Sequence, residues 1–347
     1  MSAWTFRICS QRRRVVDGHM AEWKVALAAI AAIVGAGFAS GREIVSFFTM
    51  HGKWWPLGAA ACCAAVGLLT AMLVQLARRT KSASLPQLYT RVMDEKCGEA
   101  VQVVYALMLL IVCAAMCSAA AEMGALALDS RFARPAGAAC ALALALFGAK
   151  SRGHLAGSGL IAAGVLLVFY CALCMRGPQV TAPAQQNGAL VSTGLGVLYA
   201  CLNVALAAGV ICCAGQEAAS PARAGLFTGI LLLAVLVPAC VAVKRLGDTS
   251  LALPSVALAG EMGLFGFWAS LAALFAAAVS TLASGLYSLK RQLADAGLPE
   301  KWCMSAAVLG AVTLSVVGFA PIVNVAYPLL GFLCAMLLPT LALVVKD

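Results

Sequence analysis

Charged residues are scarce in this 347-residue chain, at 11% of positions, whereas hydrophobic residues fill 63%. Soluble globular domains carry about a quarter charged residues and about half apolar ones. The chain therefore lacks the polar side chains with which a soluble domain covers its surface. Its apolar runs of about 20 residues have the length of helices that cross a bilayer. We expect an all-α integral membrane protein with the lipid bilayer as a partner.

Sequence patterns of catalysis and of nucleic-acid binding are also missing. The chain contains no HExxH or GxSxG motif, and its three histidines (His19, His51 and His154) lie near predicted membrane edges. The net charge of +10 comes from Lys and Arg spread over short loops, without aromatic–basic interleaving or zinc-ligand spacing. We therefore expect no enzyme, no catalytic residues and no nucleic-acid partner.

Fifteen cysteines are present, and most of them fall within apolar runs. A buried thiol behaves as a small hydrophobic group, which is the role we expect here. Cys171 and Cys174 form a CxxC in an apolar helix with no histidine nearby, so we expect no cofactor beyond a coupling Na⁺ or H⁺.

The chain divides into ten hydrophobic segments, of which the fourth and ninth are short. They span residues 23–48, 55–77, 99–127, 135–149, 156–175, 189–213, 222–243, 262–289, 302–318 and 322–345. We expect a basic cytoplasmic extension over residues 1–21 and a single transmembrane domain over residues 22–347. With the N terminus in the cytoplasm, most of the 24 Lys and Arg residues lie on the cytoplasmic side. The positive-inside rule then places both termini of this multi-pass chain there.

The first segment is interrupted in its middle by residues 34–43, which read VGAGFASGRE. Glycine in a helix interior costs about 1 kcal/mol relative to alanine. The adjacent Arg42 and Glu43 are also costly at membrane depth, by roughly 2.5 to 3.5 kcal/mol each. Irregular backbone at that depth is tolerated where it lines a cavity or is buried in protein, so this break is a candidate solute site. The alternative is that the glycines only let helices pack closely.

The ten segments also suggest an internal duplication, with a first repeat over about residues 23–175 and a second over about residues 189–345. An odd number of helices per repeat inverts the second half relative to the first, as in many secondary transporters. The position that matches the first break lies near residues 201–207. The one strongly polar side chain there is Asn203, so we expect a second break at this point.

The string VGAGFASGREIVSFFTMHG closely resembles the first-helix signature of the YkvI family of bacterial membrane proteins. Weaker resemblance lies around Tyr199 and Asn203, at the adjacent Ser280 and Thr281, and in AYPLLGFL at residues 326–333. The family belongs to the amino acid–polyamine–organocation superfamily. The resemblance implies the LeuT-type fold, with ten transmembrane helices in a 5+5 inverted repeat, helices one and six broken, in the bacterial cytoplasmic membrane.

The same resemblance implies a solute site and an ion site. Solute would bind the unwound backbone of helix one and residues of helix six, where positive half-helix ends favour anionic groups. The matching solute-binding positions are Gly35, Ala36, Gly37, Phe38, Ala39, Ser40, Gly41, Tyr199 and Asn203. A Na⁺ site would use carbonyls near Ala31 and Val34 with the hydroxyls of Ser280, Thr281 and Ser284. These hydroxyls alternatively bond to carbonyls of their own helix.

Three charged residues are candidates for coupling or gating. Arg42 and Glu43 either pair with each other or contact a gate partner. Glu122 lies within MCSAAAEMGAL of the third segment. Burial there would favour the neutral carboxyl and make it a proton carrier, whereas a place near the outer end would leave it solvated.

These observations favour a secondary active transporter of a small polar solute, such as an amino acid or a related compound. We expect alternating access coupled to Na⁺ or H⁺. The alternative is an uncoupled, channel-like or solute-sensing membrane protein with the same fold. The oligomeric state does not follow from the sequence.

Overall fold

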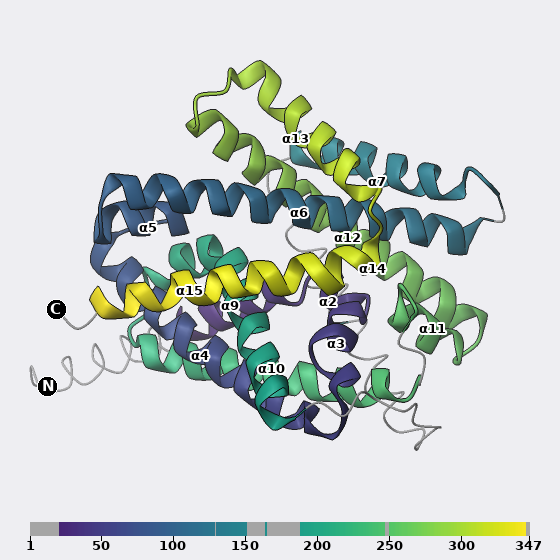
Figure 1. Ribbon diagram of the computed structural model, residues 1–347, viewed down its shortest axis with the longest axis horizontal. Coiled ribbons are helices and arrows are strands. Elements are labelled where there is room, and N and C mark those ends of the chain that lie inside the picture. Colours follow the sequence, from purple (N-terminus) through teal and green to yellow (C-terminus); the bar gives the residue numbers. More distant parts are fainter. Residues whose placement is uncertain (1–20, 129, 151–163, 165–187, 247–249, 345–347) are drawn as a thin grey trace, which may run out of the picture.

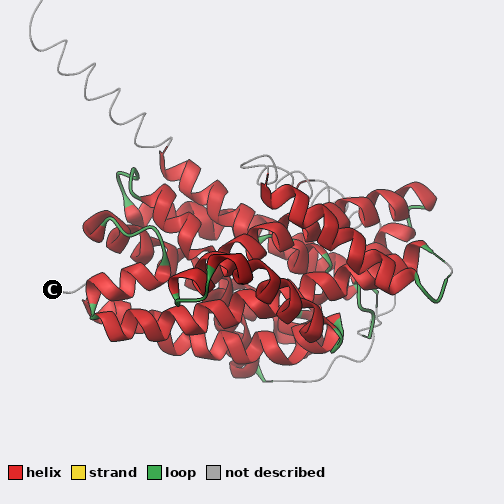
Figure 2. Ribbon diagram, turned by 90° about the horizontal axis from the view of Figure 1, so that it is seen from above, coloured by secondary structure: helices red, strands yellow, loops and turns green. Residues whose placement is uncertain are grey.

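The computed structural model describes residues 21–128, 130–150, 164, 188–246 and 250–344, and these residues form helices joined by short connections. Within the described residues no strand occurs (Figure 2). The long helices run along the horizontal axis of Figure 1 or cross it obliquely, and they pack into one bundle. In the part of the chain that the structure describes, six helical stretches are long and apolar enough to cross a membrane. They are Thr49–Thr80, Glu95–Ala127, Ala189–Gly215, Pro221–Lys244, Leu264–Asp295 and Phe319–Leu343.

The first hydrophobic segment is broken as expected. Residues 21–33 are helical and residues 34–35 form a bend. A single turn, α2 (Ala36–Ala39), follows, and a second interruption at residues 40–41 separates it from α3 (Arg42–Phe47). The 3₁₀ segment η1 (Thr49–Trp54) then leads into the second long helix. Glycines that disfavour a continuous helix therefore coincide with the interruptions.

The remaining helices are continuous rods or short connectors. Their bounds are α4 (Trp55–Thr80), α5 (Leu85–Val92), α6 (Glu95–Ala127), α7 (Ala133–Lys150), α9 (Ala189–Gly215), α10 (Pro221–Lys244), α11 (Pro254–Gly260), α12 (Leu264–Asp295), α13 (Glu300–Ser315), α14 (Phe319–Pro321), the π-helical η2 (Ile322–Ala326) and α15 (Tyr327–Val344). A π-helical turn inside a helix is rare and frequently lies at a functional site. Here it lies beside α3.

Charged side chains at the helix ends cap one helix and join two others. Asp94 caps α6 by accepting a hydrogen bond of 2.7 Å from the Cys97 amide, which holds the pKa of that carboxyl below its usual value. Lys290 near the end of α12 pairs with Glu300 at the start of α13 over 2.9 Å, and this cation lowers the pKa of the Glu300 carboxyl.

Close contacts between helices rest on glycine pairs. A Cβ atom on Gly196 of α9 would lie 2.1 Å from the Gly58 carbonyl oxygen of α4. A Cβ atom on Gly225 of α10 would lie 2.2 Å from the Gly67 carbonyl oxygen, also on α4. Helix α4 therefore lies against α9 and α10 at backbone distance. Small residues at helix interfaces allow such an approach in membranes, where packing rather than water drives association.

The structure corrects part of the expected helix pattern. Every expected segment except the fifth coincides with helical structure, and the fifth (residues 156–175) lies outside the described residues apart from residue 164. The expected break in the sixth helix is wrong, because α9 runs without interruption from Ala189 to Gly215. The Asn203 side chain donates to the Tyr199 carbonyl 3.0 Å away, one turn back. Its polar group is thus satisfied inside an intact helix. The short helices α5 and α11 were not expected.

Candidate solute and cation site at the first-helix break

The break around α2 is enclosed by protein. Ser40 is fully buried, and Arg42 and Glu43 are 4% and 6% exposed. Helix α2 packs against α6 and α12, and α3 packs against α9, α10 and η2. Such irregular backbone is tolerated at membrane depth only where protein or a cavity surrounds it. The break therefore has the surroundings that a solute site requires.

Ser40 and Gly41 hold the second interruption in place. The Ser40 hydroxyl donates to the Gly37 carbonyl over 2.6 Å and accepts from the Arg42 amide over 3.1 Å. Gly41 has a φ angle of 78°, in the left-handed region that favours glycine. A Cβ atom there would also lie 3.2 Å from Pro254. The turn thus depends on a hydroxyl at one position and on the missing side chain at the next.

Glu43 turns its carboxyl back onto the break. A Cβ atom on Gly37 would lie 1.8 Å from Oε1 of Glu43 and 2.6 Å from its Cδ. The Tyr199 hydroxyl of α9 donates to Oε2 of Glu43 over 2.8 Å. The rings of Phe47 and Phe48 pack on Tyr199, with ring centroids 5.0 and 5.3 Å away. The carboxyl therefore fills the space that Gly37 leaves open and is held there by Tyr199.

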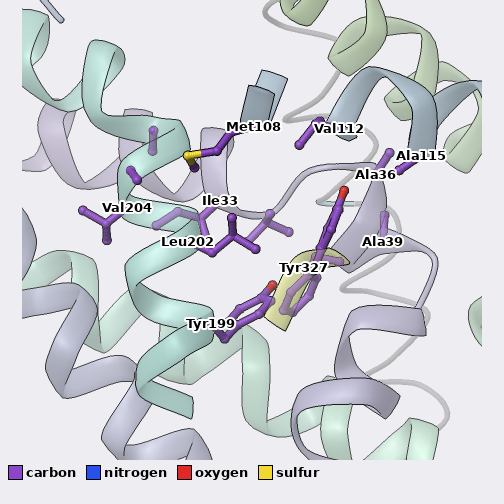
Figure 3. Packing of buried hydrophobic residues seen from close by; sticks show 14 of the residues in the cluster. Ile33, Ala36, Ala39, Met108, Val112, Ala115, Tyr199, Leu202, Val204 and Tyr327 are labelled. Carbon is purple, nitrogen blue, oxygen red and sulfur yellow. The ribbon is translucent and has the colours of Figure 1, made fainter. Parts of the chain in front are cut away.

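Tyr327, the first residue of α15, completes this cluster. It is 3% exposed and belongs to the same buried cluster as Tyr199 and the break residues Ala36 and Ala39. In Figure 3 the Tyr199 side chain on α9 points toward Tyr327 and the break. The site thus combines one carboxyl, two tyrosines and the backbone of the interrupted helix.

Arg42 and Glu43 do not pair with each other but contact different elements. Arg42 donates to the Leu251 carbonyl over 2.9 Å, in the segment before α11. The Ser255 amide of α11 donates to the Ser40 carbonyl over 3.0 Å. Of the two alternatives from the sequence, the structure therefore supports contact with other elements. Arg42 and Ser40 connect the break to α11, and Glu43 connects it to α9.

The expected Na⁺ residues are only partly brought together. A Cβ atom on Gly35 would lie 3.7 Å from the Thr281 hydroxyl, so the hydroxyl pair on α12 does lie beside the break. Val34 is buried, and Ala31 and Ser280 are half-buried. Ser284 is exposed, and its hydroxyl donates to the Thr281 carbonyl of its own helix over 3.0 Å. The self-bonding alternative thus describes Ser284, whereas the Thr281 hydroxyl lies beside the break, and the Na⁺ site stays a prediction.

Glu122 lies away from this cluster. Its carboxylate forms an ion pair of 3.2 Å with Arg134 of α7, and the two side chains are 27% and 66% exposed. A cation and solvent therefore stabilise its charge, as in the solvated alternative from the sequence. The structure does not bring it to the break.

The sequence analysis did not single out Asn324 of η2 or the contacts that Ser46 makes. The Ser46 hydroxyl of α3 donates to Oδ1 of Asn324, and Nε2 of His51 lies 2.7 Å from the Ser46 carbonyl oxygen. A polar Asn in the apolar run PIVNVAYPLL, with a proline on either side, is a signal that could have singled out this segment. The same run contains Tyr327.

Comparisons with known proteins agree with a transporter-like membrane fold. The chain is 24% identical over 329 residues to the uncharacterized membrane protein YkvI of Bacillus subtilis (strain 168). The match covers 89% of this chain and 92% of that protein. No family model matches the chain.

Among solved structures, the chain is similar to Mhp1, a nucleobase-cation-symport-1 family transporter in a closed conformation with bromovinylhydantoin bound. The TM-score is 0.56 at 15% sequence identity, over 89% of this chain and 74% of that chain. At this identity the likeness concerns the fold. Together with the YkvI relative and the six candidate spans among the described residues, it shows a membrane protein whose described part is helical and has a fold like that of a transporter.

Proposed function

We propose that this protein is a secondary active transporter that moves a small polar solute by alternating access around the interrupted first helix. The main support for this proposal is the buried interruption of the first helix at residues 34–41. Backbone polar groups, Ser40 and Glu43 lie together inside the bundle, where helices from both halves of the chain meet. Discontinuous helices with freed backbone groups form solute and ion sites in secondary transporters.

The arrangement of the other helices supports a 5+5 inverted repeat as the basis of this mechanism. In the first half a short helix, α5, stands between α4 and α6, and in the second half α11 stands between α10 and α12. Helix α5 lies at the left end of the bundle and α11 toward the right end (Figure 1). Equivalent elements at opposite ends are what inversion of one half relative to the other requires. The pairs α4–α10 and α6–α12, which the repeat would relate, also pack on each other.

We infer a solute that is small and recognised by hydrogen bonds and aromatic contact. The break offers backbone groups, and Tyr199 and Tyr327 offer hydroxyls on large rings. Amino acids and related zwitterions satisfy these groups, as the sequence suggested. The bound hydantoin of the similar structure adds cyclic amides and nucleobases to the set worth testing.

A thermal-shift screen of the purified full chain tests solute binding. The panel contains amino acids, hydantoins and nucleobases, each with Na⁺ or with choline in its place. Solutes that raise the melting temperature are then assayed for uptake into proteoliposomes under imposed Na⁺ or pH gradients. We expect at least one solute whose accumulation depends on a cation gradient. Flux that is indifferent to both gradients would instead support the channel-like alternative, and product formation without a gradient would indicate an enzyme.

The double variant Ser280→Ala and Thr281→Ala distinguishes the coupling ions in the same screen. If Na⁺ stabilises the parent protein through these hydroxyls, the double variant loses that shift and keeps its melting temperature in choline. Ser284→Ala is the matched control, because its hydroxyl bonds to its own helix. An unchanged Na⁺ shift in the double variant would contradict a Na⁺ site at Thr281.

A further inference from the structure

The Glu43 carboxyl is buried, and no cationic side chain in the described part of the chain forms an ion pair with it. Glu43 is 6% exposed. Its hydrogen-bond donor is the Tyr199 hydroxyl, which carries no charge. An ionised carboxylate is strongly disfavoured in such surroundings unless a cation accompanies it. The neutral acid does not carry that cost.

Three basic groups on α3 and η1 contact atoms other than the Glu43 carboxyl. Arg42, on α3 itself, donates to the Leu251 carbonyl. On η1, Nε2 of His51 contacts the Ser46 carbonyl oxygen, and the Lys53 amine stands over the Trp54 ring at 5.5 Å from its centroid. Lys244 is half-buried in the last turn of α10.

Arg245, which follows α10, is 9% exposed. The titratable side chains that α9 and α15 carry near the break are phenols and a thiol. Helix α9 presents Tyr199 and Cys201, α15 begins with Tyr327, and α2 and η2 contribute no titratable side chain. Among the described residues, the group that bonds to the carboxyl is the Tyr199 phenol, which donates a hydrogen bond but does not neutralise a charge. Tyr199 and the backbone at Gly37 already surround the carboxyl. A proton binds to the carboxyl itself and therefore needs no further space.

We propose that Glu43 carries the proton whose gradient drives transport. Its carboxylate takes up H⁺ from water on one side of the membrane and, as the neutral acid, is enclosed between Gly37 and Tyr199 in the conformation seen here. When the break opens to the other side, water reaches the carboxyl and the same H⁺ leaves to it. The inference rests on the proposed transport function and identifies its coupling ion. It also replaces Glu122 as the acid for this role, because Glu122 is partly exposed and paired with Arg134.

Infrared spectroscopy of the full chain in lipid nanodiscs tests the protonation directly and needs no solute. We expect a carbonyl stretching band of a protonated carboxyl that titrates in the parent protein and is lost in Glu43→Gln. Glu122→Gln is the matched control and keeps the band. Tyr199→Phe removes the hydrogen bond to Oε2 and shifts the band to higher frequency. A band that is identical in Glu43→Gln and in the parent protein would overturn the proposal.

Folding of the variants is checked by their melting temperatures. The Gln side chain has the size of Glu and still offers an oxygen to the Tyr199 hydroxyl, so we expect a folded protein. If Glu43→Gln does not fold, Glu43→Asp serves instead. This variant keeps a carboxyl but places it one methylene farther from Tyr199. We therefore expect the carbonyl band to change frequency. An unchanged band in Glu43→Asp would equally contradict the assignment.

Proteoliposome uptake then connects the proton to transport. With a solute from the screen, an imposed pH gradient should drive accumulation in the parent protein and in Glu122→Gln, and Glu43→Gln should lose it. Uptake that follows a Na⁺ gradient and ignores pH would overturn the proton assignment while leaving the transporter proposal intact. If no gradient drives uptake of any solute, the transport function fails, whereas the infrared band still decides whether Glu43 binds the proton.

Discussion

At the scale of single residues, the site depends on a glycine and a carboxyl that share one small space. Gly37 has no Cβ, and the Glu43 carboxyl occupies the position where that atom would be. The glycines of the break therefore do more than allow helices to approach each other. Each has a different role: Gly41 permits a positive φ, Gly37 admits a carboxyl, and Gly35 faces a hydroxyl of α12.

Because the two glycines have different neighbours, we expect Gly37→Ala to reduce uptake and Gly35→Ala to leave it unchanged. Gly37→Ala places a methyl group 1.8 Å from Oε1 of Glu43, and the flexible end of that side chain must move. We expect a folded protein in which gradient-driven uptake falls roughly tenfold or more, a loss of about 1.4 kcal/mol in the interaction that positions the carboxyl. Gly35→Ala is the control, because its methyl group meets Thr281 at an ordinary 3.7 Å.

Uptake and melting temperature are measured for both variants. Equal uptake by Gly37→Ala and Gly35→Ala would show that the position of the Glu43 carboxyl is irrelevant to transport. A larger fall in uptake for Gly35→Ala would show that the contact with Thr281 matters more for transport than the contact with Glu43.

At the scale of helices, continuity and contact are decided by how polar groups and backbones are accommodated. Helix α9 stays intact at Asn203 because the side-chain amide finds the Tyr199 carbonyl one turn back. That helix can then lie flat against α4, where Gly58 and Gly196 bring the two backbones together. An unbroken α9 supplies a rigid surface from which Tyr199 reaches Glu43.

Two glycines on α9 make a matched test of this contact. Gly196→Leu forces a side chain into the Gly58 carbonyl, which is 2.1 Å from the new Cβ. Overpacking of this kind destabilises proteins by about 1–3 kcal/mol, so we expect a clear fall in melting temperature. Gly194→Leu, two residues away, is the control, because nothing lies within 4 Å of its Cβ position. If the two variants melt alike, α4 and α9 do not meet at Gly196.

At the scale of the whole molecule, the two ends of the bundle differ in the elements they carry. Helix α5 packs under the end of α15, where the Tyr89 hydroxyl donates to the Leu337 carbonyl over 2.6 Å. Helix α11 lies toward the other end and bonds to the break through Ser255. From the basic residues around α5, among them Arg78, Arg79 and Arg91, the positive-inside rule predicts that this end of the bundle faces the cytoplasm.

Reporter fusions test this orientation. Green fluorescent protein fused after Asp347 should fluoresce, and alkaline phosphatase at the same position should be inactive, because the positive-inside rule places that end in the cytoplasm. Alkaline phosphatase inserted after Lys53 should be active. The reverse pattern at both positions would invert the assigned orientation, and cells with parent levels of each fusion serve as the expression control.

Local chemistry along the chain was enough for the class of protein, the position of most helices and the first break. Long apolar runs specify helices in a bilayer wherever they occur, and a cluster of glycines beside charged residues disfavours a helix whatever surrounds it. The same reasoning failed at Asn203, since a polar side chain interrupts a helix only when it finds no partner within that helix.

Contacts between distant residues were decided by the tertiary structure alone. Glu43 and Tyr199 are 156 positions apart, and nothing in either neighbourhood identifies the other as its hydrogen-bond partner. Glu122 and Glu43 both lie within apolar segments, yet packing brings Arg134 to the first carboxyl and the Tyr199 hydroxyl to the second. Whether a carboxyl needs a proton depends on which groups surround it in space. Helix packing sets that environment, and hydrophobic periodicity does not.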